Sequence, residues 1–423
     1  MVSDELKDRL KLAYADFCSK APADQQARVK AMLQKAHQQT CDACARPEGA
    51  RIDYPELAHA WGMLSDDETP PAAFSVEGLA AEALVLKDGS ILGFGKYELL
   101  DLGWSEAVIE WLAHLFDKAA FGTDPPRDPI PSMPESTTIA LAGDWGAETT
   151  WPPTKKIADL IKHLINDHAP DFTIHLGDVY YVGTKPAEAS QLVDSWPRGS
   201  IASFALNSNH EMYDGGFGLF DVAYKEAFNQ NPNTGQPTHT SYFALKNQHW
   251  ILVSLDSAYY ASELDMYMTG KLNQGQIDWL KQVADQAGDR KIIVLSHHPG
   301  LPETGSPQET LWSQVRGALS SAGPAYWYWG HIHEAIVYNA QDGVLGRCAG
   351  HGSIPYGAAS ELVGPQQEGV VDWYETKLAN DPDVPMRVLN GFVHLRLDGP
   401  ILTEEFIGEN GETRWQRASG SRG

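Results

Sequence analysis

The chain has 423 residues, 43% of them hydrophobic, and its 56 acidic residues against 32 Lys and Arg give a formal net charge of −24. This length exceeds a single ordinary core, so we expect two or three domains. A surface this acidic repels nucleic-acid backbones and anionic lipids, which excludes a nucleic-acid duplex and a membrane as expected partners. An anionic substrate would need a local feature that reverses this field, and bound metal ions could do so.

The N-terminal sequence MVSDELKDRLKL is charged and lacks the apolar stretch of a secretory signal. No run approaches the roughly 20 apolar residues that cross a bilayer. The cysteines, Cys18, Cys41, Cys44 and Cys348, are too sparse for a disulfide framework. We therefore predict a cytoplasmic protein. The CxxC formed by Cys41 and Cys44 is weak evidence for a metal site, and incidental thiols are the better interpretation.

The N-terminal region, residues 1–121, is predicted to be mainly helical. Residues 3–40 have the apolar spacing of a helical hairpin, and 103–120 that of a further helix in which Ser105 is the expected N-cap. Between them, 82–101 alternates around an Asp-Gly pair, which favours a β-hairpin. Five prolines in 122–136 indicate a linker, so the region before it is a candidate lid or cap.

In the remaining residues, 137–417, the predicted strands alternate with loops and helices. The runs TTIALAGDWG and DFTIHLGDVYYVG flank a helical segment, a pattern typical of parallel strands. Later strands are IASFALNSNHE, HWILVSLDSAYY, RKIIVLSHHPG and AYWYWGHIHE, and the tail forms antiparallel hairpins around Asp-Gly and Asn-Gly turns. We predict an α/β fold in which two sheets form a sandwich flanked by helices.

The expected strand ends carry side chains that bind metal ions. They are Asp144 in GDWG, Asp178 in GDVYY, Asn209 and His210 in SNHE, His297 in VLSHH, and His331 and His333 in GHIH. Carboxylate, amide oxygen and imidazole suit zinc, manganese and iron. Loops at the carboxyl ends of strands share one edge of a sheet, so these residues can converge. His331 and His333 could serve one ion or two neighbouring ions.

Each motif alone has a simpler interpretation. An Asp after a strand commonly forms a turn or caps a helix, and an Asn-His pair commonly hydrogen-bonds a loop. The whole ordered set is much harder to explain in this way. We therefore predict a metal centre. His298 could touch the substrate, but we interpret it as a solvent-facing or hydrogen-bonded loop residue.

The ordered set GDWG, GDVYY, SNHE, VLSH and GHIH resembles the calcineurin-like metallophosphoesterase superfamily, and its form is most similar to the purple acid phosphatase branch. The resemblance implies a catalytic domain over residues 137–417 with two metal ions. It implies that Asp178 bridges them, that Asp144, Tyr181 and His333 bind the first ion, and that Asn209, His297 and His331 bind the second.

One exchange places the chain near the purple branch. Most of the superfamily has a histidine where this chain has Gly146, whereas in the purple branch the tyrosine of GDxxY binds the metal instead. Spacing from Asp178 favours Tyr181 for this role, and Tyr180 is the candidate in the other register. A phenolate stabilises a trivalent ion, so we expect Fe(III) at the first site and Fe(II), Zn(II) or Mn(II) at the second.

The resemblance also implies the reaction. It predicts metal-dependent hydrolysis of phosphate monoesters, as small substrates, by a hydroxide activated at the two-metal site, with His210 as the proton donor to the leaving group. The alternative is a phosphodiesterase that uses the same site on cyclic nucleotides or other diesters. A scaffold whose chemistry has lapsed is a third interpretation, and residues 1–121 could bind a protein partner. The family usually has glycine where this chain has Ser208.

Overall fold

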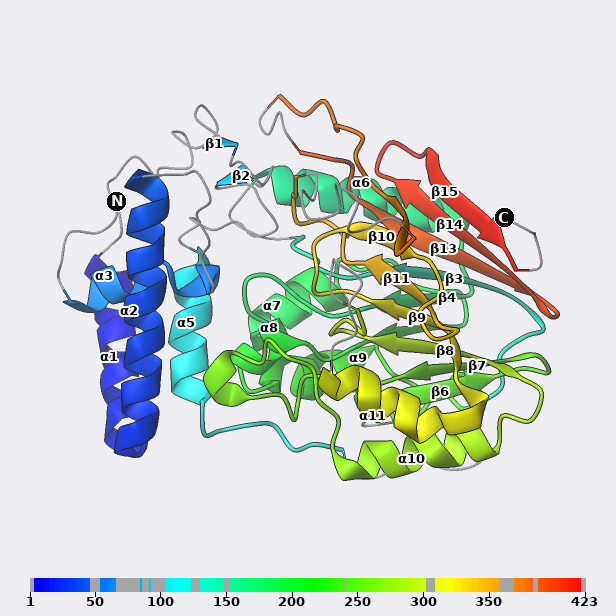
Figure 1. The fold of residues 1–423 in the computed structure, drawn as a ribbon, viewed down its shortest axis with the longest axis horizontal. Helices are drawn as coiled ribbons and strands as arrows, with labels where there is room; N and C mark the ends of the chain where they lie inside the picture. Colours follow the sequence, from blue (N-terminus) through cyan, green and yellow to red (C-terminus); the bar gives the residue numbers. More distant parts are fainter. Residues whose placement is uncertain are drawn as a thin grey trace.

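The computed structural model describes the chain in eleven segments: residues 4–45, 54–65, 84–85, 91–92, 103–122, 130–147, 152–238, 240–301, 309–357, 369–382 and 387–419. Within these segments, two large sheets lie beside the N-terminal helices, to their right in Figure 1. The first has seven strands, in spatial order β12 (Val371–Tyr374), β10 (Ala335–Tyr338), β11 (Leu345–Ala349), β9 (Pro324–Trp329), β8 (Lys291–Ser296), β7 (Trp250–Ser254) and β6 (Phe243–Lys246).

The second sheet has six strands. Their spatial order is β15 (Thr413–Ala418), β14 (Ile401–Gly408), β13 (Gly391–Asp398), β3 (Ser136–Ala142), β4 (Phe172–His175) and β5 (Ala202–Ala205). Strands β3, β4 and β5 run parallel, and so do β7, β8, β9 and β11 in the other sheet. The loops after these parallel strands therefore gather at the carboxyl edges of the two sheets.

Alternation along the strands builds the core. Leu141 of β3 and Ile293 of β8 belong to the apolar cluster between the sheets, whereas Ala140 of β3 packs outward with the helix α6 (Pro152–His168). On the far side, α10 (Gln274–Asp285) and α11 (Glu309–Leu319) cover the seven-stranded sheet, as Figure 1 shows. The predicted two-sheet sandwich flanked by helices is confirmed.

The short helices that follow β3 in the described segments lie mostly in the loops around the sheet edges. They are α7 (Lys185–Ala187), η3 (Glu188–Val193), α8 (Asn209–Tyr213), η4 (Leu219–Ala223), α9 (Tyr224–Glu226), η5 (Glu263–Asp265) and η6 (Ser320–Ala322). None of the helices in the described segments is both long and apolar enough to span a membrane.

The N-terminal region is helical, as predicted. It contains α1 (Asp4–Lys20), α2 (Ala23–Ala45), η1 (Pro55–Leu57), α3 (Ala60–Ser65) and α5 (Gly103–His114), and the short strands β1 (Leu84–Val85) and β2 (Ile91–Leu92) pair antiparallel. The turn expected between β1 and β2 lies outside the described residues. The N-cap predicted for Ser105 is wrong, because α5 already begins at Gly103 and Ser105 is buried inside its first turn.

The end of the predicted linker is joined to the seven-stranded sheet. Met133 donates a backbone hydrogen bond to Lys246 of β6, and Lys246 donates one to Pro131. Ile130 and Met133 are buried. Residues 130–134 are therefore anchored to the sandwich, and most of the remaining proline-rich stretch lies outside the described residues.

Candidate metal centre

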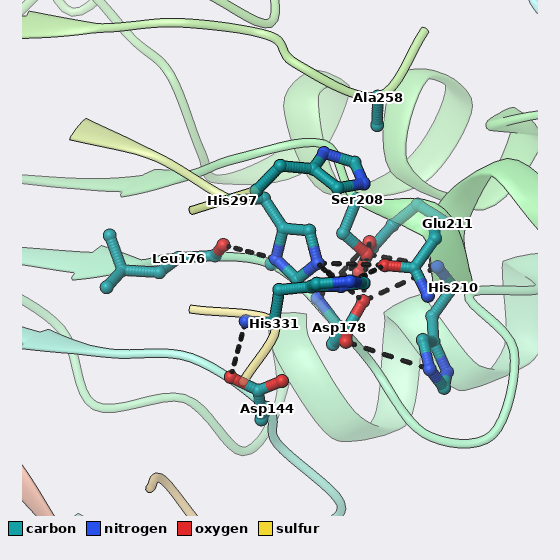
Figure 2. Close-up of polar contacts among 12 residues, drawn as sticks. Asp144, Leu176, Asp178, Ser208, His210, Glu211, Ala258, His297 and His331 are labelled. Carbon is teal, nitrogen blue, oxygen red and sulfur yellow. Dashed lines mark hydrogen bonds and ion pairs between the residues drawn. The ribbon is translucent and has the colours of Figure 1, made fainter. Parts of the chain in front are cut away.

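The six ligands predicted at strand ends, leaving the tyrosine aside, converge at one edge of the sandwich. Asp144 follows β3, Asp178 follows β4, Asn209 begins α8 after β5, His297 follows β8, and His331 and His333 follow β9. All are buried, and His331 is the most exposed of them at 9%. Figure 2 shows Asp144, Asp178, His297 and His331 pointing into one region.

One group of these atoms is built around His297. Its Nδ1 donates to the Leu176 carbonyl at 2.9 Å, which leaves Nε2 as an acceptor 2.8 Å from Asn209 Oδ1. The Asn209 amide is oriented by its Nδ2, which donates to Tyr213 Oη at 3.0 Å. His331 Nδ1 lies 3.1 Å from His297 Nε2 and 3.1 Å from Asn209 Oδ1. Acceptors this close repel one another unless a proton or a cation lies among them, so the set suits a metal ion.

A second group is built around Asp144. Its Oδ1 accepts no hydrogen bond in the described part of the chain and lies 3.3 Å from His333 Nε2, while its Oδ2 accepts from the His331 backbone N–H at 3.2 Å. One ligand-type atom each from Asp144, Asp178 and His333 lies within 4.8 Å of the others. Asp178 also lies beside the first group, with Oδ1 3.3 Å from His297 Nε2. Asp178 is thus shared by the two groups.

Burial dominates the electrostatics of the centre. It raises the pKa of Asp144 and of Asp178 well above the ordinary range, and the Asp144 charge raises that of Asp178 further. Burial also lowers the pKa of His331 to about 3 and that of His297 well below its ordinary value. Adjacent buried carboxylates are costly without a cation, and neutral imidazoles are the form that binds metals. The residues therefore fit two metal ions.

The backbone at three of these residues is strained. Asp144, Asp178 and His331 have φ angles of 61°, 69° and 67°, in the left-handed region that non-glycine residues rarely adopt. Such strain persists only where the surrounding structure holds it, and it concentrates at functional sites. Gly177 has a φ of 100°, and a Cβ there would lie 2.7 Å from His297 Nδ1. Only glycine lets these loops approach so closely.

Comparison with known families agrees with this geometry. Residues 137–335 match the family of calcineurin-like phosphoesterases. The matched residues, 137–335, are here called the phosphoesterase domain. No curated protein matches the chain.

Solved structures resemble the domain at low sequence identity. One is GAP50, the anchor in the inner membrane complex of Plasmodium (14% identity, TM-score 0.48, covering 67% of this chain and 88% of that one). Another is a purple acid phosphatase from yellow lupin seeds (13% identity, TM-score 0.47, covering 69% of this chain and 55% of that one). A third is a dimetal phosphatase from Danio rerio (13% identity, TM-score 0.44, covering 67% of this chain and 98% of that one).

The tandem tyrosines of the phosphoesterase domain point in different directions. Tyr180 Oη lies 2.5 Å from His333 Nε2, at the metal centre. The ring of Tyr181, the predicted ligand, packs edge-on against Trp104 with centroids 5.3 Å apart, and faces Gly103, where a Cβ would lie 2.4 Å from the ring. The structure therefore brings the hydroxyl of Tyr180 to the centre and places the ring of Tyr181 against the N-terminal region.

The predicted proton donor, His210, lies next to the shared carboxylate. Its Nε2 is 3.6 Å from Asp178 Oδ2 (Figure 2). Its Nδ1 donates to the Tyr181 carbonyl at 2.8 Å. Burial lowers its pKa to about 3, so the ring is neutral with its proton on Nδ1. Transfer of a proton from Nε2 therefore needs a nearby negative charge that raises this pKa.

His298 is a loop residue, as predicted. Its Nδ1 lies 2.9 Å from Ser257 Oγ and its Nε2 lies 2.7 Å from the Tyr267 carbonyl, so both ring nitrogens have partners away from the predicted ligands. Its ring nevertheless lies near that of His331, with centroids 4.8 Å apart. His298 is thus part of the wall around the centre.

Two supporting residues, Glu211 and Ser208, had no predicted role. The Glu211 carboxylate accepts from the backbone N–H groups of Asp178 and Val179 at 3.3 and 2.9 Å. The Ser208 hydroxyl contacts both the Asp178 and the Glu211 carboxylates, and it caps α8 by accepting from the His210 N–H at 3.1 Å. The SNHE motif contains both residues, so their position beside Asn209 was the available signal.

Proposed function

We propose that this protein is a phosphatase that hydrolyses phosphate monoesters at a two-metal site. The observation that carries the proposal is the shared position of Asp178, whose carboxylate lies between the Asp144–His333 group and the Asn209–His297 group. A bridging carboxylate with oxygen and nitrogen ligands on each side is the arrangement that two adjacent cations need.

The ligands divide into two sets. We propose Asp144, Asp178, His333 and the Tyr180 hydroxyl for the first ion, and Asp178, Asn209, His297 and His331 for the second. Tyr180 replaces the predicted Tyr181 because its hydroxyl is the one that lies at His333. Fe(III) at the phenol site, with Fe(II), Zn(II) or Mn(II) at the other, remains the proposed pair. When bound, two such ions polarise phosphoryl oxygens and lower the pKa of a coordinated water.

His210 is the proposed proton donor to the leaving oxygen. The hydrogen bond from Nδ1 to the Tyr181 carbonyl fixes the ring so that Nε2 lies on the side of Asp178. A phosphate dianion beside Nε2 would favour the imidazolium form, because an opposite charge stabilises the protonated ring. The proton then passes from Nε2 to the departing alkoxide.

The preference for monoesters rests on the tyrosine exchange. Gly146 occupies the place at which most of the superfamily has a histidine, and its N–H donates to Ser353 Oγ at 2.8 Å. A tyrosine hydroxyl is present at the centre instead, as in the purple acid phosphatase branch that the motifs resemble. The substrate is therefore a small phosphate ester. We also keep the cytoplasm as the proposed compartment, since Cys18, Cys41 and Cys348 form no disulfide within the described segments.

The test compares hydrolysis of an aryl phosphomonoester and the matching diester, before and after chelation and reloading with iron and zinc or iron and manganese. Metal-dependent turnover that favours the monoester supports the proposal. A preference for the diester would make the protein a phosphodiesterase, and absence of turnover with both metals bound would favour a scaffold. Absorption spectra add a second readout, because Tyr180→Phe should remove the Fe(III)–phenolate charge-transfer band and Tyr181→Phe should keep it.

A further inference from the structure

A side chain from outside the phosphoesterase domain reaches the candidate centre. Trp104 belongs to α5, which precedes the family-matched residues 137–335, and it is 1% exposed. Its ring centroid lies 5.7 Å from that of Tyr180, 5.3 Å from that of Tyr181 and 5.4 Å from that of His210. The N-terminal region therefore contacts the proposed proton donor directly.

His210 is enclosed by aromatic rings. Tyr180 stacks on it with centroids 4.2 Å apart and planes 28° apart, Tyr213 packs at 5.0 Å, and Trp104 packs at 5.4 Å. A ring packed on several sides cannot rotate about its χ angles without displacing a neighbour. Its Nδ1 hydrogen bond therefore persists, and Nε2 keeps its direction toward Asp178.

Helix α5 is itself held against the domain. Trp111 Nε1 donates to the Glu263 carbonyl at 2.9 Å, and Lys118, just after the helix, pairs with the Glu263 carboxylate at 2.6 Å. At the start of the helix, Gly103 lies so close to Tyr181 that a Cβ has no room. Helix α5 is thus held at several points, and the contact of Trp111 is only one of them.

We propose that Trp104 is a positioning residue, which holds the His210 imidazole in the orientation that its proton transfer requires. The proposal rests on the proposed phosphatase function. It assigns the N-terminal region a part in the reaction, because Trp104 completes the aromatic enclosure that Tyr180 and Tyr213 leave incomplete. Removal of the indole should let the His210 ring rotate and should expose it to reagents.

The experiment uses Trp104→Ala and Trp104→Phe in the full chain, with Trp111→Phe and Trp111→Ala as matched controls. Trp111 is also a buried tryptophan of α5, in the same apolar cluster, but its indole hydrogen-bonds Glu263.

Two quantities are measured at equal metal content. One is carbethoxylation of His210 by diethyl pyrocarbonate, located by mass spectrometry. The other is the ratio of kcat for an alkyl phosphate, a poor leaving group, to kcat for an aryl phosphate.

We expect Trp104→Ala to raise labelling of His210 and to lower the alkyl-to-aryl kcat ratio by about tenfold, since a misplaced general acid matters most for poor leaving groups. Trp104→Phe should have a smaller effect of the same sign, and it replaces Trp104→Ala in the test if the alanine variant does not fold. The Trp111 variants should leave the ratio as in the wild type.

The proposal is overturned if folded Trp104 variants keep both the protection of His210 and the wild-type ratio, or if the Trp111 variants change them equally. Wild-type protein that hydrolyses no phosphate ester would refute the proposed function instead. In that case the labelling result still decides whether Trp104 encloses His210.

Discussion

Glu56 makes the stability of the N-terminal region dependent on pH. It lies in η1, is 3% exposed, and its Oε2 has no hydrogen-bond partner among the described residues. Burial raises its pKa from an ordinary value of 4.5 to about 7. The folded state therefore binds the proton more tightly than the unfolded state, so this contribution is fully present below pH 4.5 and is lost as the pH rises to about 7.

The size of the effect follows from the pKa values. At about 1.4 kcal/mol per pH unit, a rise from 4.5 to about 7 corresponds to a free-energy penalty of roughly 3 kcal/mol once the buried carboxyl is charged. Glu56→Gln removes this penalty because the amide is neutral at every pH. Between pH 5 and pH 8, the free energy of unfolding of the variant relative to the wild type should rise by about 2–3 kcal/mol.

The assay is urea unfolding at pH 5 and pH 8, followed by far-ultraviolet circular dichroism and tryptophan fluorescence. The matched control is Glu226→Gln, at an exposed position, which should change stability equally at both pH values. A difference between the Glu56 variant and the wild type that is the same at pH 5 and pH 8 would refute the reasoning. It would show that the carboxyl is not kept neutral by burial.

Four further outcomes are expected. Asp178→Asn should lower the content of both metals together, measured by plasma emission spectrometry after reloading, because both groups share that carboxylate. Burial lowers the pKa of His175 to about 3, so the contribution of the neutral ring to stability is present above pH 6.5 and is lost as the pH falls to about 3. His175→Phe should therefore reduce the fall in melting temperature between pH 6.5 and pH 3. Arg347→Met should cost about 3–5 kcal/mol in urea unfolding, since Glu404 is left buried without its cation. A fragment that begins at residue 122 should aggregate on size-exclusion chromatography, because it exposes the apolar surface that α5 covers.

The sequence by itself determined the sandwich and the position of the six candidate ligands after its strands. Apolar runs such as TTIALA predicted strands because a parallel strand that is covered on both faces is apolar along its length. Ligand-type residues after those strands predicted the centre because parallel strands end at one edge. These inferences need only the local pattern and one rule of sheet topology. The short strands β6, β10 and β12 lack a signal of this strength and were not predicted.

Only the tertiary structure decided how side chains are oriented beyond the strand ends. Tyr180 and Tyr181 are the same residue type one position apart, so their spacing could not show which hydroxyl reaches His333. The loop backbone after β4 sets that choice, with Asp178 in a left-handed conformation that few non-glycine residues adopt. Trp104 reaches His210 across a long sequence separation, through packing of α5. Such contacts depend on the complementarity of whole surfaces, which no local pattern specifies.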